Sequence, residues 1–265
     1  MSHLRFMVVV GLISAIPIAS HAANEQATKG KEETAAREKR DQGKEPAPAQ
    51  IAADANGARS AMERPVYKPP LRGSPAGRVG GGTRGASDRE SFSLLVLAPD
   101  HVGLTMQDQP SLYWFISKPT SYPVELTIIE RNAVKPLVEK VIHGIDRGGI
   151  HAIRLSDYGV RLARDVPYKW FVTLVTDAAH RSKDILAGGI IRRVDAPPTV
   201  AARLEGADGN TAFRVYTEEG YWYDSLGAIS GMIEASPGNE ELRKGRASLL
   251  EQVGLTEAAA FEKNR

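Results

Sequence analysis

The chain contains no cysteine in its 265 residues. Disulfide bridges, thiolate zinc sites, iron–sulfur clusters and a cysteine nucleophile are therefore excluded. Charge of one sign is not in excess either, because the net charge is only +2. Binding of nucleic acid through overall charge is accordingly not expected. The remaining composition, with 42% hydrophobic and 25% charged residues, is that of an ordinary globular chain.

Long hydrophobic runs are also scarce, and the one that stands out is N-terminal, from Phe6 to Ile18. Arg5 precedes this run, and Ser20 and Ala22 supply the small residues that a signal peptidase reads. We therefore expect a signal peptide over residues 1–22. A membrane anchor is the alternative, but about 13 apolar residues are fewer than the about 20 that span a bilayer. The expected location is periplasmic or secreted, with no transmembrane segment after cleavage.

Residues 23–91 lack a sustained apolar period and are rich in Pro, Gly, Ala and charged residues, which predicts a disordered linker. The second half of the linker carries an excess of basic residues, namely Arg59, Arg64, Lys68, Arg72, Arg78, Arg84 and Arg89. Such a stretch could contact an acidic polymer or an acidic partner. The alternative is a solvated linker that charge keeps soluble.

A glycine-rich stretch, Gly80–Gly85, matches two phosphate-binding patterns by spacing alone. No strand pattern precedes the stretch and no helical pattern follows it, and Ala86 stands where a P-loop needs lysine. We therefore expect no nucleotide and no other cofactor at this stretch.

After Phe92 the apolar residues alternate in short runs that Gly, Pro, Asn and Asp separate, which predicts an antiparallel immunoglobulin-like or fibronectin-like β-sandwich over residues 92–216. Leu162 lies six residues before Tyr168, which opens a strand, and this spacing predicts a buried tyrosine whose hydroxyl bonds to the backbone across a corner. An additional strand is expected at 200–203 or 213–217.

The apolar period becomes helical after about residue 216, where Trp222, Leu226, Ile229 and Ile233 fall on one helix face. Ser236–Asn239 form a break, and a second stripe runs from Leu242 to Val253. We therefore predict a C-terminal helical hairpin over residues 217–255, followed by a tail over residues 256–265.

Two clusters are candidate sites. Asp177, Arg181, Ser182 and Asp184 form a polar loop after a predicted core strand, and this loop either binds a ligand or makes its own turn and salt bridges. Tyr221, Tyr223 and Asp224 are a candidate interface, since tyrosine is enriched in interfaces. The histidines lack the paired spacing of metal ligands, so no metal site and no catalytic constellation is expected.

Several motifs together resemble the exported bacterial proteins of the family named domain of unknown function 928. The motifs, taken along the chain, are Gly80–Gly85, Pro110–Phe115, Leu162 with Tyr168–Trp170, Asp177 with Arg181–Ser182, Gly189–Val194, Gly220–Leu226 and Leu249–Leu255. Val175-Thr176-Asp177 departs from a pattern with cysteine before the aspartate. The resemblance implies export and a shared fold, and it implies no particular activity.

These observations favour a non-enzymatic envelope protein that binds a protein partner, as an accessory to a secretion or surface-assembly system. The alternative is a glycan-binding or glycan-acting domain that uses the loop from Asp177 to Asp184.

Overall fold

Residues 64–70, 77–80 and 92–265 are described by a computed structural model of the chain, and all of them belong to one unit, residues 54–265. The expected signal peptide at 1–22, most of the expected linker, and Gly81–Gly85 of the glycine-rich stretch lie outside the described residues.

The described residues contain nine strands in two sheets. The strands are β1 (Val79–Gly80), β2 (Leu94–Val96), β3 (Gly103–Thr105), β4 (Ser111–Ile116), β5 (Val124–Glu130), β6 (Val138–Ile142), β7 (Gly149–Arg154), β8 (Pro167–Leu174) and β9 (Ile185–Arg193). The larger sheet has the order β1-β9-β8-β5-β6 with β3 also beside β9, and the smaller sheet has the order β2-β4-β7. All strand pairs are antiparallel except β3 with β9. The expectation of antiparallel sheets is therefore confirmed.

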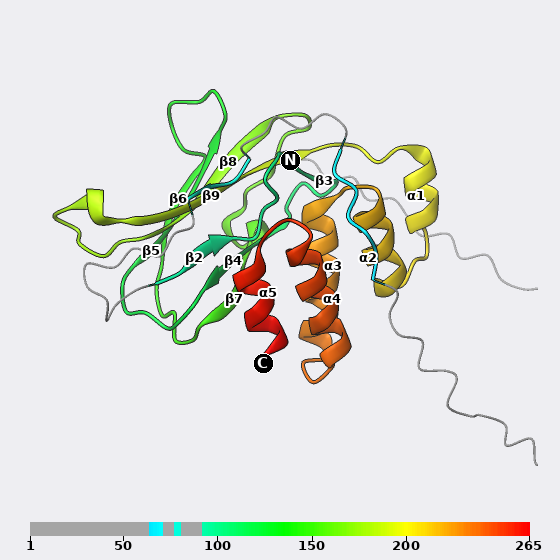
Figure 1. Ribbon diagram of the computed structural model, residues 1–265. Helices are drawn as coiled ribbons and strands as arrows, with labels where there is room; N and C mark the ends of the chain where they lie inside the picture. Colours follow the sequence, from blue (N-terminus) through cyan, green and yellow to red (C-terminus); the bar gives the residue numbers. More distant parts are fainter. Residues whose placement is uncertain (1–63, 71–76, 81–91) are drawn as a thin grey trace, which may run out of the picture. The chain divides into compact units, whose positions relative to one another are not determined.

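The smaller sheet packs against the larger sheet and against α3 and α5, and α3 also contacts β3 of the larger sheet directly. Strand β4 shows why the smaller sheet is covered on both faces, because it carries five consecutive buried residues, Leu112 to Ile116. A strand that buries side chains on both faces needs a packed layer on each side, and it therefore shows a continuous apolar run. The larger sheet contacts the smaller sheet through β2, and α3 and α5 contact β4 and β7 (Figure 1).

The corner before β8 has the predicted tyrosine. Tyr168 is buried, and its hydroxyl accepts a hydrogen bond of 3.2 Å from the backbone N–H of Ala163. Leu162, also buried, precedes Ala163. The bond ties the loop before β8 to the start of that strand, as the spacing of Leu162 and Tyr168 predicts.

The C-terminal part contains five α-helices, which begin earlier and end later than predicted. They are α1 (Pro198–Leu204), α2 (Gly209–Glu218), α3 (Trp222–Ala235), α4 (Glu240–Glu251) and α5 (Thr256–Lys263). The prediction of an additional strand at 200–203 or 213–217 is wrong, because α1 and α2 occupy these residues. The expected tail at 256–265 contains α5.

The helices α3 and α4 occupy the range in which two helices were predicted. Trp222, Leu226 and Ile229 of the predicted stripe are fully buried. Asn239 ends the break and caps α4, because its side-chain oxygen accepts from the N–H groups of Glu241 and Leu242. Figure 1 shows α3, α4 and α5 side by side next to the smaller sheet.

Two segments of the expected linker are ordered parts of the fold. Residues 64–70 lie against the helices, and β1 pairs with β9. The guanidinium of Arg78 donates to the carbonyl oxygens of Ala98 (3.3 Å) and Val253 (3.1 Å), so this basic side chain holds the fold together and is not free for an acidic polymer. A composition rich in Pro and Gly predicts that a segment forms neither helix nor a regular strand. Such a segment can still be ordered when its backbone groups and aromatic side chains have partners in the fold.

Among the described residues, no helix combines the length and the apolar character that a membrane crossing needs.

Candidate functional site: an exposed sheet edge and an occupied groove

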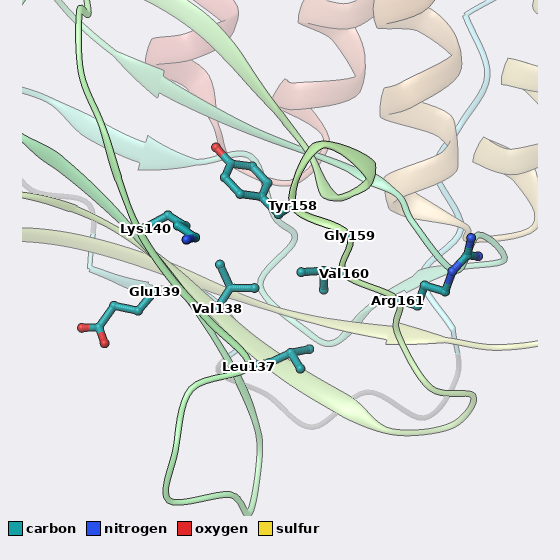
Figure 2. Close-up of a pocket in the computed structure, with 8 residues that line it drawn as sticks. All are labelled: Leu137, Val138, Glu139, Lys140, Tyr158, Gly159, Val160 and Arg161. Carbon is teal, nitrogen blue, oxygen red and sulfur yellow. The ribbon is translucent and has the colours of Figure 1, made fainter.

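The outer edge of β6 borders an open pocket of about 400 Å³. The pocket is lined by Leu137–Lys140 on one side and by Tyr158–Arg161 on the other. Figure 2 shows the side chains of Val138 and Val160 turned toward each other, and both are buried. Glu139, Lys140 and Arg161 are exposed around this apolar floor. The pocket thus has an apolar floor and a charged rim, which is the layout of small protein-binding surfaces.

Exposed apolar side chains gather on the hairpin that ends in β6. The described residues contain six exposed large apolar side chains, and three of them, Val134, Leu137 and Val141, belong to this hairpin. Val134 is 95% exposed. Within the described part of the chain, β6 pairs with β5 alone, so its other edge offers backbone groups to a partner.

Residues 64–70, which we call the strap, fill a groove that the C-terminal ends of α2 and α4, the start of α3 and the loop with His101 form. Burial alternates along the strap, with Pro65 and Tyr67 buried and Val66 and Lys68 exposed. The Tyr67 ring packs edge-on against Trp222, with 5.1 Å between ring centroids. It also stacks on His101, with 5.9 Å between centroids and 1° between planes.

Polar contacts hold the strap backbone in this groove. The side chain of Gln252 accepts from the N–H of Tyr67 (2.7 Å) and donates to the carbonyl oxygen of Pro65 (3.2 Å). The N–H of Lys68 donates to the carbonyl oxygen of Thr217 at 3.2 Å. We call the residues that receive the strap, His101, Thr217, Gly220, Trp222 and Gln252, the strap groove.

The polar loop between β8 and β9 makes its own ion pairs. The carboxylate of Asp177 accepts from the side chains of His180 (2.7 Å) and Lys183 (3.0 Å). The guanidinium of Arg181 binds both carboxylate oxygens of Glu125, at 2.9 and 2.5 Å, and also binds Asp184 at 2.8 Å.

Ser182 is exposed in the short 3₁₀ turn of this loop, Arg181–Lys183. The structure thus brings Arg181 and Asp184 together with Glu125 on β5, and it pairs Asp177 with other partners. The bidentate contact with Arg181 lowers the pKa of Glu125. Hydrogen bonds from Lys183 and His180 to the carboxylate of Asp177 lower the pKa of Asp177. Of the two alternatives for this loop, its geometry matches the one in which it makes its own turn and salt bridges.

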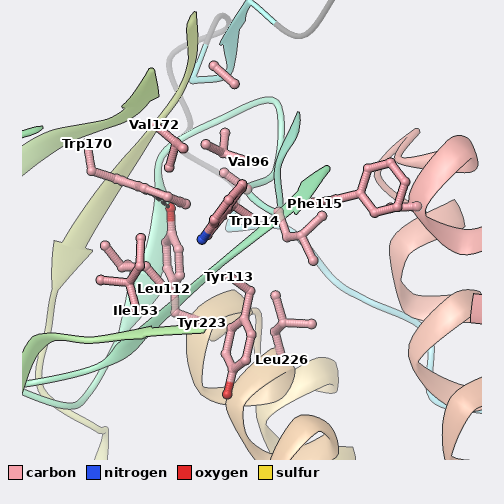
Figure 3. Close-up of a cluster of buried hydrophobic side chains, with 14 of the residues drawn as sticks. Val96, Leu112, Tyr113, Trp114, Phe115, Ile153, Trp170, Val172, Tyr223 and Leu226 are labelled. Atoms are coloured by element: carbon pink, nitrogen blue, oxygen red, sulfur yellow. Dashed lines mark hydrogen bonds between the residues drawn. The ribbon is translucent and has the colours of Figure 1, made fainter. Parts of the chain in front are cut away.

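The expected interface at Tyr221, Tyr223 and Asp224 is not on the surface. All three side chains are buried, with at most 5% of their area exposed. Tyr223 lies in the core next to Trp170 (Figure 3), and its hydroxyl accepts from Nε1 of Trp170 at 2.9 Å. The same hydroxyl donates to the carbonyl oxygen of Ile190 at 3.2 Å. The prediction of exposed tyrosines is wrong because other elements cover the start of α3. The helix itself packs against β3 of the larger sheet, and Tyr221, which precedes α3, packs with Val200 of α1 and Val215 of α2.

Asp224 is a buried carboxyl group in the first turn of α3. Its Oδ2 accepts from the N–H of Met106 at 3.0 Å, which fastens the turn after β3 to the first turn of α3. Burial raises the pKa of Asp224 to about 7. A shifted pKa can mark a catalytic acid, but this carboxyl group is enclosed by protein and bonded to backbone. Its position points to a structural role.

The described residues bring no group of three or more His, Asp or Glu side chains close enough to hold a metal ion. His101 touches Tyr67, His151 stacks on Trp114, and His180 pairs with Asp177.

Sequence reasoning missed the β6 edge and the strap groove. The edge had a local signal, since Val134, Leu137 and Val141 are apolar residues around a predicted strand. The groove had none, because it joins the strap to residues near 101, 217 and 252, and only the folded chain brings these together.

Comparison with known proteins gives a family and no named relative. A search of curated proteins finds no match. A solved multi-domain immunophilin from Arabidopsis thaliana aligns over 63% of this chain and 98% of its own, with 10% identity and a TM-score of 0.16, which is too low to carry an argument. The model of the family described as Domain of Unknown Function (DUF928) matches residues 79–262, which is more than half of the chain. The chain therefore belongs to the DUF928 family.

Proposed function

We propose that this protein is an exported, non-enzymatic binding module that captures an extended segment of a partner protein along the outer edge of β6. The observation that carries the proposal is the position of Leu137 and Val141, which are half exposed on or beside the terminal strand of the larger sheet. Exposed apolar side chains on an edge strand are usually avoided, because they invite pairing with another chain. Their presence at this edge therefore supports a binding role.

The chemistry of the edge favours one kind of partner. An extended segment adds to a sheet edge through main-chain hydrogen bonds, and pockets beside the edge select alternate side chains. The pocket floor of Val138 and Val160 suits an apolar side chain of such a segment. The partner we infer is thus an extended segment with alternating apolar residues, from a secretion or surface-assembly system of the envelope.

Affinity capture tests this proposal. The tagged chain that begins at residue 23 is exposed to envelope extracts, alongside a double variant, Leu137→Lys with Val141→Lys. Lysine on an edge strand opposes strand addition. Leu186→Lys is the matched control, since Leu186 is an exposed apolar residue on β9. We expect a partner that binds the wild type and the control and is lost with the double variant. A partner retained by all three would overturn the role of β6.

The glycan alternative has weaker support. The charged side chains of the loop from Asp177 to Asp184 pair with one another or with Glu125, so a glycan would have to displace existing ion pairs. A glycan array that gives a signal with the wild type and none with Arg181→Ala would favour this alternative over protein binding.

Export and an immunoglobulin-like strand layout belong to the same proposal. The N-terminal apolar run supports export. The corner bond of Tyr168, together with two largely antiparallel sheets whose apolar faces meet, supports the strand layout. An experimental structure aligned strand by strand with immunoglobulin domains would test the layout.

A further inference from the structure

The strap is bound in the manner of a peptide ligand. Its backbone runs without helical turns (Figure 1), alternate side chains enter the groove, and a single aromatic residue, Tyr67, is the anchor. Extended peptides are commonly recognised in this way, by an aromatic-lined groove together with hydrogen bonds to the peptide backbone.

Gln252 supplies the backbone recognition. The carboxamide of Gln252 donates to the carbonyl oxygen of Pro65 and accepts from the N–H of Tyr67, so it binds two backbone groups that lie two residues apart. A side chain that bonds only to backbone accepts any segment of the right shape. The requirement for tyrosine comes instead from the ring contacts with Trp222 and His101, and from the 3.3 Å contact between the Tyr67 hydroxyl and Nε2 of His101.

At Gly220 the strap groove admits the backbone of the bound segment only because this residue has no side chain. Gly220 has a φ of +81°, and a Cβ atom there would lie 2.5 Å from the carbonyl oxygen of Lys68. Glycine at this position therefore serves two needs, a left-handed backbone and close passage of the bound segment.

The strap and its groove differ in their relation to the family. The match to the family covers residues 79–262, which includes His101, Thr217, Gly220, Trp222 and Gln252. The receiving residues thus lie inside the family match, and the strap lies before its first residue.

We infer that the strap groove is a recognition site for an extended Pro-x-Tyr segment of a partner protein, and that the strap is its built-in occupant. The strap and the partner segment compete for the same contacts, so the site opens when the strap leaves. This inference is independent of the β6 edge, because the two sites share no residue.

The test uses the full chain with the anchor removed, Tyr67→Ala, and a labelled synthetic peptide of residues 63–71 as the probe. Fluorescence anisotropy should show saturable binding to this variant at least tenfold tighter than to the wild type, whose groove is filled. Adding Gln252→Ala to the variant, or replacing the tyrosine of the peptide with alanine, should weaken binding at least tenfold. Equal binding to the variant and the wild type, or no binding to the folded variant, would overturn the inference.

A second measurement avoids any loss of folding in the variant. Hydrogen exchange at Tyr67 and Lys68 is followed in the wild type, where both N–H groups are bonded to the groove. Saturating free peptide should accelerate this exchange severalfold, and unchanged exchange would count against competition. Wild-type dimers that disappear with Tyr67→Ala would show that the occupant is the strap of a second copy, and would overturn the assignment to a partner protein.

Discussion

Tyr223 places a polar hydroxyl among apolar side chains, and the fold satisfies it on both sides. The hydroxyl accepts from Trp170 and donates to Ile190. Gly103 makes room for its ring, because a Cβ atom there would lie 2.5 Å from Cε2 of Tyr223. The ring and the hydroxyl together join α3 to two strands of the larger sheet, β8 and β9.

Replacement of this hydroxyl should destabilise the fold. We expect Tyr223→Phe to lower the free energy of unfolding by about 1–3 kcal/mol, because the buried N–H of Trp170 loses its acceptor. Urea denaturation measures the change. Tyr158→Phe, at the half-buried rim of the β6 pocket, is the control and should change stability by less than about 0.5 kcal/mol. Equal effects of the two substitutions would contradict the importance of the bond.

The carboxyl group of Asp224 should make stability depend on pH. Its pKa rises from 3.8 to about 7 on folding, so the folded state holds the proton more tightly than the unfolded state. Its stabilising contribution is then complete below about pH 4 and is lost as the pH rises through about 7. A shift of this size corresponds to about 4 kcal/mol.

The measurement is the free energy of unfolding of the wild type and of Asp224→Asn from pH 4 to pH 8. The asparagine variant lacks this titration, so the wild type should lose stability relative to the variant as the pH rises. A difference between the two proteins that does not change with pH would show that Asp224 does not titrate in this range.

At the scale of residues, local spacing predicted some roles and missed others. The corner bond of Tyr168 follows from its place six residues after Leu162 and is confirmed. The exposure of Tyr221 and Tyr223 was predicted wrongly, because adjacent residues at the start of a helix can all be buried when packed elements surround that end. The periodicity of one helix shows which face is most apolar and does not show how many neighbours the helix has.

At the scale of elements, α5 is held to α4 by a buried ion pair. Nε and one terminal nitrogen of Arg246 donate to Oε2 of Glu262, at 2.9 and 2.5 Å, and the other terminal nitrogen donates to Ser230. A buried charge without its partner is far more costly than a pair replaced by apolar residues. The pair therefore makes α5 sensitive to changes in either partner.

A double-mutant cycle tests this coupling. Glu262→Leu should lower the free energy of unfolding by about 3–5 kcal/mol, since Arg246 is left buried without its carboxylate partner. The combination of Arg246→Met with Glu262→Leu should cost less than either single change. Thermal and urea unfolding measure both quantities, and additive effects of the two single changes would contradict the coupling.

Elements with strong local patterns were predictable, and those with mixed signals were not. The apolar run of β4 and the stripe of α3 are confirmed. Helix α2 contains β-branched and aromatic residues, which favour a strand, yet Asp208 caps its start by accepting from the N–H of Thr211. Helix α5 follows Gly254, a normal stop signal, and is stabilised by tertiary contacts that no local pattern shows.

At the scale of the whole molecule, the proposed export predicts a processed N-terminus. Expression of the full chain in a Gram-negative host, followed by N-terminal sequencing of the extracytoplasmic fraction, should give a first residue of Ala23. Ala22→Arg should block cleavage, because the peptidase requires a small residue before the cut. His21→Ser should leave cleavage unchanged. An intact Met1 on extracytoplasmic protein would contradict a cleaved signal.

Sites assembled from distant segments could not be predicted at this scale. The strap groove joins Tyr67 to Gln252, and the β6 pocket joins Val138 to Val160. Each site exists only after the chain has closed on itself, so neither the composition nor the periodicity of any one segment contains it. Composition marked the strap only as proline-rich.

The burial of β4 on both faces has a consequence for the order in which the chain is made. A ribosome completes the smaller sheet before it reaches α3 and α5, and until then Phe115 lacks its ring contact with Phe261 of α5. The hydrogen bond from the N–H of Tyr67 to the side chain of Gln252 likewise cannot form until Gln252 has been synthesised. The native contacts of the smaller sheet and of Tyr67 are therefore complete only after α3, α4 and α5 have been synthesised.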